Sequence, residues 1–441
     1  MWRICASGAV SAASMYALSG TAMCESPHDE KVPGVYVWGR TGSTHLQSPQ
    51  RIAYFDKELM NDVASDSSGH LFAFCTHKGN VVQWDPDAGL PQPSLSGRDI
   101  HQVRVSNGVI YGLAKSGRVY SWDHPIENSS RSWWKFWSRG STSPALTELQ
   151  VPRLGWWEKI AEIDTGKDHI LARTNKGRVF SGSTGVKAPK ESKGQFGIAS
   201  MSQFDSPPAP GALHEIKLLR GNNITNIAAG DYHSLVLSDK GHVFGFGENI
   251  YGQLARPFSQ RAANIAVPEQ IAANLGKVCS IAAGGGMSYL TVRDPHTNDL
   301  QYYSFGNGLT AQLGTGKFAH AQPTPQRIRP LEDLREYSES LKKVVQIPVK
   351  SLSVGATHTI ATLASSDVLV WGGSMYFQLG TGKKSTVSTP SSIPPLDVAR
   401  DGAPVVPGAG PSNERLQLQA FGKIHQRIYA GDGVSILYYK K

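Results

Sequence analysis

Cysteine is scarce in this sequence. Only four of its 441 residues are cysteines, at positions 5, 24, 75 and 279, and they form neither a C-x-x-C pair nor a Cys/His pattern with zinc-ligand spacing. The sequence therefore indicates no zinc site and no disulfide framework. Because Cys75 and Cys279 lie in or beside strand patterns, we expect both thiols to be buried as small apolar groups.

The short motifs of common catalytic sites are also missing. The sequence contains no G-x-S-x-G elbow, no H-E-x-x-H motif and no nucleophile with an identifiable base. Residues 245–252 superficially match a dinucleotide-binding loop, but they lie inside a repeat and open no crossover helix. We therefore predict no catalytic residue, no cofactor and no metal site, and we do not expect an enzyme.

Acidic residues are absent from the first 24 positions, where Arg3 is the single charged residue. A segment that is rich in Ser and Ala and lacks acidic residues is typical of mitochondrial targeting, and we favour this interpretation for residues 1–31. A secretory signal is an alternative, although the rest of the chain has only two cysteines. Residues 4–23 carry no charge over about the length that spans a bilayer, so a membrane anchor is a third possibility.

The charge balance is moderately basic. There are 44 Lys and Arg residues against 35 Asp and Glu, which gives a formal net charge of +9. Such an excess favours anionic partners such as acidic lipid or nucleic acid, and it is also common in mitochondrial matrix proteins. No run of Lys and Arg with interleaved aromatics forms a recognisable nucleic-acid module, so we do not expect sequence-specific nucleic-acid binding.

What the sequence does contain is a repeat. Seven copies of one strand ending recur, which reads Val-x-x-Trp in its best form, with Phe or Gly in place of Trp in some copies. Short strands with glycine turns and a repeated aromatic are typical of β-propeller blades. The copies lie at residues 35–38, 81–84, 119–122, 179–182, 243–246, 302–305 and 368–371.

The two ends of the chain carry complementary halves of the repeat. A second block, best seen at residues 227–237, precedes most strand endings. Residues 430–437 copy this block without a following Val-x-x-Trp, whereas residues 35–38 lack the block before them. Pairing these half-blades would close a ring and remove exposed sheet edges. We therefore predict an all-β fold, a seven-bladed β-propeller over residues 32–441 closed by its N- and C-terminal half-blades.

The repeat resembles that of a known family. The blocks at residues 228–235, 243–249 and 251–254 are similar to the RCC1 (regulator of chromosome condensation) repeat, and residues 311–314 and 377–380 match its trailing Gln-Leu-Gly segment. Behind such a leader, the chain resembles the mitochondrial RCC1-like proteins, including a fungal branch tied to respiratory-chain assembly. The family includes exchange factors, ligase-associated domains and scaffolds, so the resemblance implies the fold more specifically than an activity.

Uneven repeat spacing predicts insertions, and the first holds five of the ten tryptophans. Trp is enriched at interfaces and at lipid headgroups, and the adjacent basic residues would suit anionic lipid or an acidic partner. The alternative is that these rings fold back and cap the rim of the propeller. The insertions are placed near residues 123–158, 183–223, 317–348 and 383–415. The candidate interaction residues are Trp133, Trp134, Lys135, Phe136, Trp137, Arg139, Trp156 and Trp157.

Two further insertion segments carry their own expectations. Leu331, Leu334, Leu341 and Val344 recur at helical spacing and predict a short amphipathic helix over residues 331–345. We expect loops in two stretches rich in Pro, Gly, Ser and Ala, at residues 187–210 and 388–413.

Three histidines occupy one repeat position, at His169, His233 and His358. Equivalent positions in different blades lie around a ring, so these side chains are not expected to converge on a metal or catalytic site. We expect each to bond a neighbouring turn, and the repeat tryptophans to pack between blades.

Two functions fit these observations. The first is a non-enzymatic mitochondrial platform that binds protein partners and aids assembly of a respiratory-chain complex, or of the mitochondrial ribosome, at the inner membrane. The second, by analogy with the founding family member, is a guanine-nucleotide exchange factor for a mitochondrial GTPase. Exchange needs no catalytic triad, because it depends on binding the nucleotide-free GTPase more tightly than the loaded form.

Overall fold

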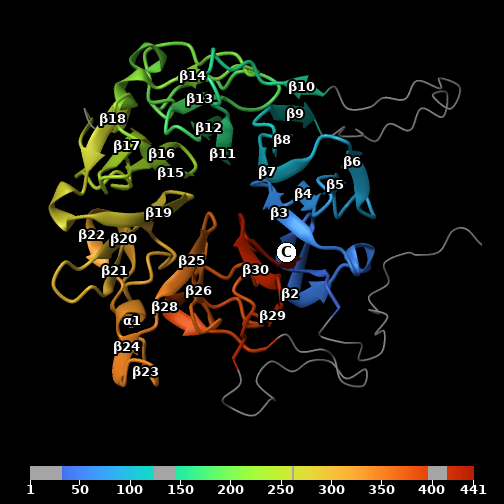
Figure 1. The fold of residues 1–441 in the computed structure, drawn as a ribbon, viewed down its shortest axis with the longest axis vertical. Helices are drawn as coiled ribbons and strands as arrows, with labels where there is room; N and C mark the ends of the chain where they lie inside the picture. Colours follow the sequence, from blue (N-terminus) through green and yellow to red (C-terminus); the bar gives the residue numbers. More distant parts are fainter. Residues whose placement is uncertain (1–31, 124–145, 261–262, 396–414) are drawn as a thin grey trace, which may run out of the picture.

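The computed structural model describes residues 32–123, 146–260, 263–395 and 415–441. In this part of the chain, seven antiparallel sheets stand around a central axis, each with its first strand innermost (Figure 1). The expected seven-bladed propeller is confirmed. No helix among the described residues is long and apolar enough to cross a membrane.

The blades are numbered along the chain, and the strands of each blade run from the axis outward. Blade 1 consists of β3 (Met60–Ser65), β4 (Phe72–Thr76), β5 (Val81–Trp84) and β6 (Gln92–Leu95). Blade 2 consists of β7 (Ile100–Ser106), β8 (Val109–Ala114), β9 (Val119–Asp123) and β10 (Thr147–Glu148). Blade 3 consists of β11 (Ile160–Thr165), β12 (His169–Thr174), β13 (Val179–Ser183) and β14 (His214–Glu215). Blade 4 consists of β15 (Ile224–Ala229), β16 (His233–Ser238), β17 (Val243–Glu248) and β18 (Asn264–Ile271). Blade 5 consists of β19 (Val278–Gly284), β20 (Met287–Arg293), β21 (Leu300–Gly308) and β22 (Ala319–Arg327). Blade 6 consists of β25 (Val349–Val354), β26 (His358–Leu363), β27 (Val368–Gly372) and β28 (Val387–Ser392).

Blade 7 joins the two ends of the described chain. Its strands are β30 (Ile424–Ala430), β31 (Val434–Lys440), β1 (Val35–Thr41) and β2 (Thr44–Arg51), with the short β29 (Ala420–Phe421) beside β30. β1 pairs antiparallel with β31, from Val35 opposite Tyr438 to Gly39 opposite Val434. The predicted closure by N- and C-terminal half-blades is therefore confirmed, and it leaves no gap in the ring.

The second strand of each blade lies between two neighbouring sheets. All six residues of β8, β16 and β26 are buried. A strand covered on both faces can be apolar along its whole length, which explains runs such as Leu-Val-Leu at residues 235–237. The blade interfaces between these strands form most of the hydrophobic core.

The ring has two distinct faces. Because strands within a blade are antiparallel, the turns from first to second and from third to fourth strand share one face. The central cavity opens there, and we name it the cavity face. The turns from second to third strand and the links between blades lie on the other side, which we name the opposite face.

The expected helix over residues 331–345 is wrong. Only Arg329–Glu332 is helical (α1), and a hairpin of β23 (Arg335–Ser338) and β24 (Lys343–Gln346) follows. The Gln346 side chain both accepts from the Leu300 backbone N–H (2.7 Å) and donates to its carbonyl (2.8 Å). This tertiary anchor holds the hairpin against blade 5, which outweighs a helical pattern of only four apolar residues.

Other expectations about insertions need correction as well. The stretch 388–413 contains most of β28, and residues 396–414 lie outside the described part of the chain. Residues 187–210 are a loop as expected, which includes a buried Phe196 and a short 3-10 helix, η3 (Ala199–Met201). Cys75 is buried as expected, but Cys279 is exposed, at the register shift between Val278 and Ser280 on the inner strand β19. The remaining 3-10 helices are η1 (Ala53–Phe55), η4 (Lys217–Leu219) and η6 (Ala273–Leu275).

Candidate functional site

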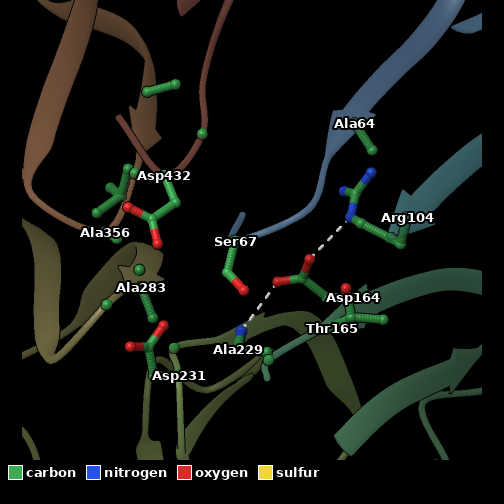
Figure 2. A pocket seen from close by; sticks show the side chains of 18 of the residues that line it. Ala64, Ser67, Arg104, Asp164, Thr165, Ala229, Asp231, Ala283, Ala356 and Asp432 are labelled. Atoms are coloured by element: carbon green, nitrogen blue, oxygen red, sulfur yellow. Dashed lines mark hydrogen bonds and ion pairs between the residues drawn. The ribbon is translucent and has the colours of Figure 1, made fainter. Parts of the chain in front are cut away.

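The central cavity has a volume of about 310 Å³ and is lined by the ends of the inner strands of all seven blades. Small residues bring the backbone close to the axis, as at residues 227–230 and 281–285. Charged side chains from different blades project among them (Figure 2). The cavity therefore has a backbone wall with a few polar groups.

Arg104 ties four blades together at this wall. Its guanidinium contacts Asp62 of blade 1 and Asp164 of blade 3, both at 2.8 Å. The second oxygen of Asp164 accepts the backbone N–H of Ala229 in blade 4 at 2.9 Å (Figure 2). Burial lowers the pKa of Arg104, but the two carboxylates outweigh it and the pKa is raised. Arg104 is thus a permanently charged structural bridge.

A second set of charges lies nearer the cavity mouth. Lys167 pairs with Asp231 at 2.7 Å, joining blades 3 and 4. Within blade 7, Asp432 lies 3.6 Å from Arg40, and burial raises the pKa of its carboxyl against the opposing effect of Arg40. These charged side chains are therefore paired with one another at the cavity wall.

The three repeat histidines form identical contacts between neighbouring blades. Each Nε2 lies 2.9 Å from a serine Oγ of the next blade, which in turn donates to a glutamine backbone carbonyl in the trailing segment of the histidine's own blade. The sets are His169–Ser234–Gln195, His233–Ser288–Gln253 and His358–Ser435–Gln378. We name each set a histidine relay. The partner is therefore a strand serine of the next blade, whereas the sequence led us to expect a neighbouring turn.

The relay fixes the protonation state of the imidazole. Since the serine proton goes to the glutamine carbonyl, the serine oxygen accepts from Nε2–H, and Nδ1 carries no proton. Nδ1 of all three rings has no hydrogen-bond partner. Burial lowers the pKa to about 3 for His169 and His358 and to about 4 for His233. Neutral imidazoles thus act as structural donors.

The junction between blades 5 and 6 uses a tyrosine where the relays use a histidine. Met287 stands at its position in blade 5, and the hydroxyl of Tyr289 bonds Thr359 of blade 6 at 2.9 Å while donating to the carbonyl of Gln312. The indole N–H of Trp371 donates to the same carbonyl at 2.9 Å. Trp38 and Trp122 are likewise buried with a bond to the preceding blade, whereas Trp84 is only half-buried.

The trailing segments also shape the cavity face. In blades 3 to 6 the side-chain oxygen of the trailing Gln accepts a backbone N–H two residues earlier, at 2.6–2.9 Å. The residue three positions before the Gln is the buried Ser192 in blade 3, but an exposed apolar residue in blades 4, 5 and 6. Those residues are Ile250, Leu309 and Met375, with 36%, 51% and 67% of their surface exposed. Blades 4, 5 and 6 therefore present a row of apolar side chains, which we name the apolar arc.

The sequence-predicted interaction residues divide into two groups. Trp133, Trp134, Lys135, Phe136, Trp137 and Arg139 lie outside the described residues. Trp156 and Trp157 lie on the link between blades 2 and 3, on the opposite face, and are 80% and 84% exposed. These two rings do not fold back over the rim. Sequence reasoning missed the apolar arc, whose signal is an apolar residue three positions before each Gln-Leu motif.

A group of possible metal ligands lies elsewhere on the surface. Ligand atoms of His70, Asp85 and Asp87 fall within 4.8 Å of one another in blade 1. Asp87 already accepts the backbone N–H and hydroxyl of Ser43 and pairs with His70 at 3.0 Å. These contacts explain why the three side chains lie together, because they hold the corner of a loop.

Comparison with known proteins agrees with this geometry. Residues 224–253 and 240–290 match models of the regulator of chromosome condensation (RCC1) repeat. The chain is 29% identical to "Protein FMP25, mitochondrial" of Saccharomyces cerevisiae over 92% of this chain and 73% of that protein.

Solved structures share the fold. Human WBSCR16 superimposes with a TM-score of 0.65 at 18% identity, covering 93% of this chain and 99% of that one. Prp20p of Saccharomyces cerevisiae gives 0.59 at 17% identity, covering 94% and 92%. The matched repeats and the closed ring of seven blades make the chain similar to RCC1 repeat proteins, among them a mitochondrial one.

Proposed function

We propose that this protein is a non-enzymatic interaction platform in mitochondria that helps to assemble a respiratory-chain complex, or the mitochondrial ribosome, at the inner membrane. Its similarity to the mitochondrial protein FMP25 over most of both chains supports the location. The paired charges of the cavity support a binding role over a catalytic one.

The apolar arc is the observation that carries the proposal. One exposed apolar residue is ordinary, but three at equivalent positions on adjacent blades form an extended contact surface. The turns that hold Ile250, Leu309 and Met375 are fixed by their glutamines, so the arc is pre-organised for a partner. A protein partner is the occupant whose chemistry suits such a row.

The test is a crosslinking pull-down of tagged full-length protein from purified mitochondria, read by mass spectrometry. We expect respiratory-complex or ribosomal subunits with the wild type, and their loss with the double variant Leu309→Glu/Met375→Glu. Tyr337→Glu, at an exposed site on the opposite face, is the matched control and should retain them. Recovery of the same proteins with the arc variant, or of no such subunit with the wild type, would contradict the proposal.

The second candidate is a guanine-nucleotide exchange factor for a mitochondrial GTPase. The fold is shared with Prp20p, a protein with binding properties toward Gsp1p and histones. The chain is also 22% identical to the human regulator of chromosome condensation over 368 residues. This candidate requires that purified protein accelerate release of labelled nucleotide from a mitochondrial GTPase. A GTPase captured in the pull-down and released by added GTP would favour it over the assembly platform.

A further inference from the structure

Trp156 and Trp157 form a braced tip on the opposite face. Their ring centroids lie 6.3 Å apart at 73°, and both rings are more than three-quarters exposed. Trp157 has a φ of 60°, a left-handed conformation that bulky residues rarely adopt. Rings this exposed gain little packing free energy within the chain to offset the unusual backbone conformation. The geometry therefore points to a ligand outside the fold.

Hydrogen bonds to adjacent turns hold the tip in place. Asn175 donates from its side chain to the carbonyl of Trp157 (3.1 Å) and accepts the backbone N–H of Lys159 (3.0 Å). Glu158 accepts the backbone N–H of Gly155 (2.8 Å) and pairs with Arg178 (3.1 Å). The two indoles are therefore presented on a fixed support.

Lysines surround this tip on four adjacent blades. The turn between the second and third strands carries one lysine in each of blades 1 to 4. The link before blade 3 and the link after blade 4 carry one more each. None of the six pairs with a carboxylate in the described part of the chain, and all six are exposed. They are Lys78, Lys115, Lys159, Lys176, Lys240 and Lys277.

Lysines are in excess on one half of the opposite face. Asp99 and Asp239 are exposed among the same turns and links, and the six lysines outnumber them. The corresponding turn and hairpin of blade 5 carry both signs of charge, and Asp299 there is paired with Arg335. The excess of unpaired lysines therefore lies on the half that bears the tryptophans. We name the two tryptophans and six lysines the basic tryptophan face.

We propose that the basic tryptophan face docks on an anionic lipid bilayer, with the two indoles in the headgroup layer and the lysines above the lipid phosphates. Indoles favour this layer because they are apolar with one N–H, and lysines near an anionic surface add affinity without a specific pocket. Two rings at 73° form a wedge, not the series of stacking platforms that single-stranded nucleic acid uses. The cavity face would then point away from the bilayer.

This inference deepens the proposed function, because it assigns the face that meets the inner membrane and leaves the apolar arc free for a partner. The experiment is flotation of purified full-length protein with vesicles of phosphatidylcholine, with and without phosphatidylglycerol. The mixture contains no partner protein, so failure to bind vesicles would leave the platform proposal standing.

Two sets of variants separate binding from folding. Trp157→Gly with Trp156→Ser removes both rings, and glycine adopts a φ of 60° without strain, so the melting temperature should not fall. Lys115→Gln, Lys176→Gln and Lys240→Gln together should lower the partition coefficient about 100-fold, since each lysine contributes about fivefold.

The matched control removes the same charge from the cavity face through Lys187→Gln, Lys190→Gln and Lys317→Gln, all at exposed sites. We expect the wild type and this control to bind anionic vesicles equally, and the tryptophan variant to bind at least tenfold more weakly. Residues 1–31 are common to all proteins compared, so any contribution from them is equal.

Three outcomes would overturn the proposal: no binding of the wild type to anionic vesicles, equal losses for the two lysine triples, or unchanged binding of the tryptophan variant. Loss of RNA or acidic-protein binding in the variants, with vesicle binding intact, would assign the face to that other partner.

Discussion

Lowering the pH from 7 to 5 should destabilise the ring by about 6 kcal/mol through the three histidine relays alone. The folded-state pKa values are about 3 for His169 and His358 and about 4 for His233, against about 6.5 in an unfolded chain. Between these values the unfolded chain binds protons that the folded ring excludes. The stability is therefore complete above pH 6.5 and falls as the pH drops toward the folded values.

The magnitude depends little on the folded-state values. At pH 5 each unfolded imidazole is about 1.5 pH units below its pKa, which corresponds to about 2 kcal/mol for one histidine. Any folded pKa well under 5 gives nearly the same figure. Protonation inside the ring would also place a new N–H donor at Nδ1, where no acceptor stands.

The assay is urea unfolding of the wild type and of His233→Gln at pH 7 and pH 5. Glutamine can still donate to Ser288 but does not titrate, so the loss between the two pH values should shrink by about 2 kcal/mol in the variant. Stability at pH 7 is not the readout, since the substitution also changes packing. An identical pH dependence in the two proteins would refute the assignment of the neutral Nε2–H tautomer and its burial.

Three other outcomes are expected. Arg104→Met should cost about 3 kcal/mol in urea unfolding, because it leaves two carboxylates between blades without their cation; an unchanged midpoint would show that they are satisfied in another way. Cys279 should react with a thiol reagent in the native protein while Cys75 does not, since burial raises the pKa of Cys75 to about 12; mass mapping of the labelled peptides decides this. Deleting residues 432–441 should abolish the cooperative thermal transition, because β1 loses its partner; a sharp transition would contradict the role of ring closure.

The repeat made the ring predictable from the sequence. The Val-x-x-Trp endings became third strands, and the incomplete copies at the two ends became one blade, because a β-strand edge needs a partner. The histidines were placed correctly away from any shared site. Their partners could not be assigned, because Ser234 and Ser288 belong to the following repeat and contact depends on how blades stack.

Other features lay beyond sequence reasoning for a different reason. The hairpin at residues 335–346 is decided by the bond between Gln346 and Leu300, a contact across 46 positions that no local period contains. The exposure of Trp156 and Trp157 depends on a left-handed backbone conformation at Trp157, which a tryptophan in a sequence does not predict. The apolar arc emerges only when three blades are placed side by side.

Closure through β31 sets an order of events during synthesis. A chain that emerges from its N-terminus releases β1 first, yet the strand that receives it is almost 400 positions later. Until β31 arrives, the edge of β1 and the flank of blade 1 stay open to other chains. The ring therefore stays open until β31 has been made, and a chaperone that holds the early blades would have most to protect in that interval.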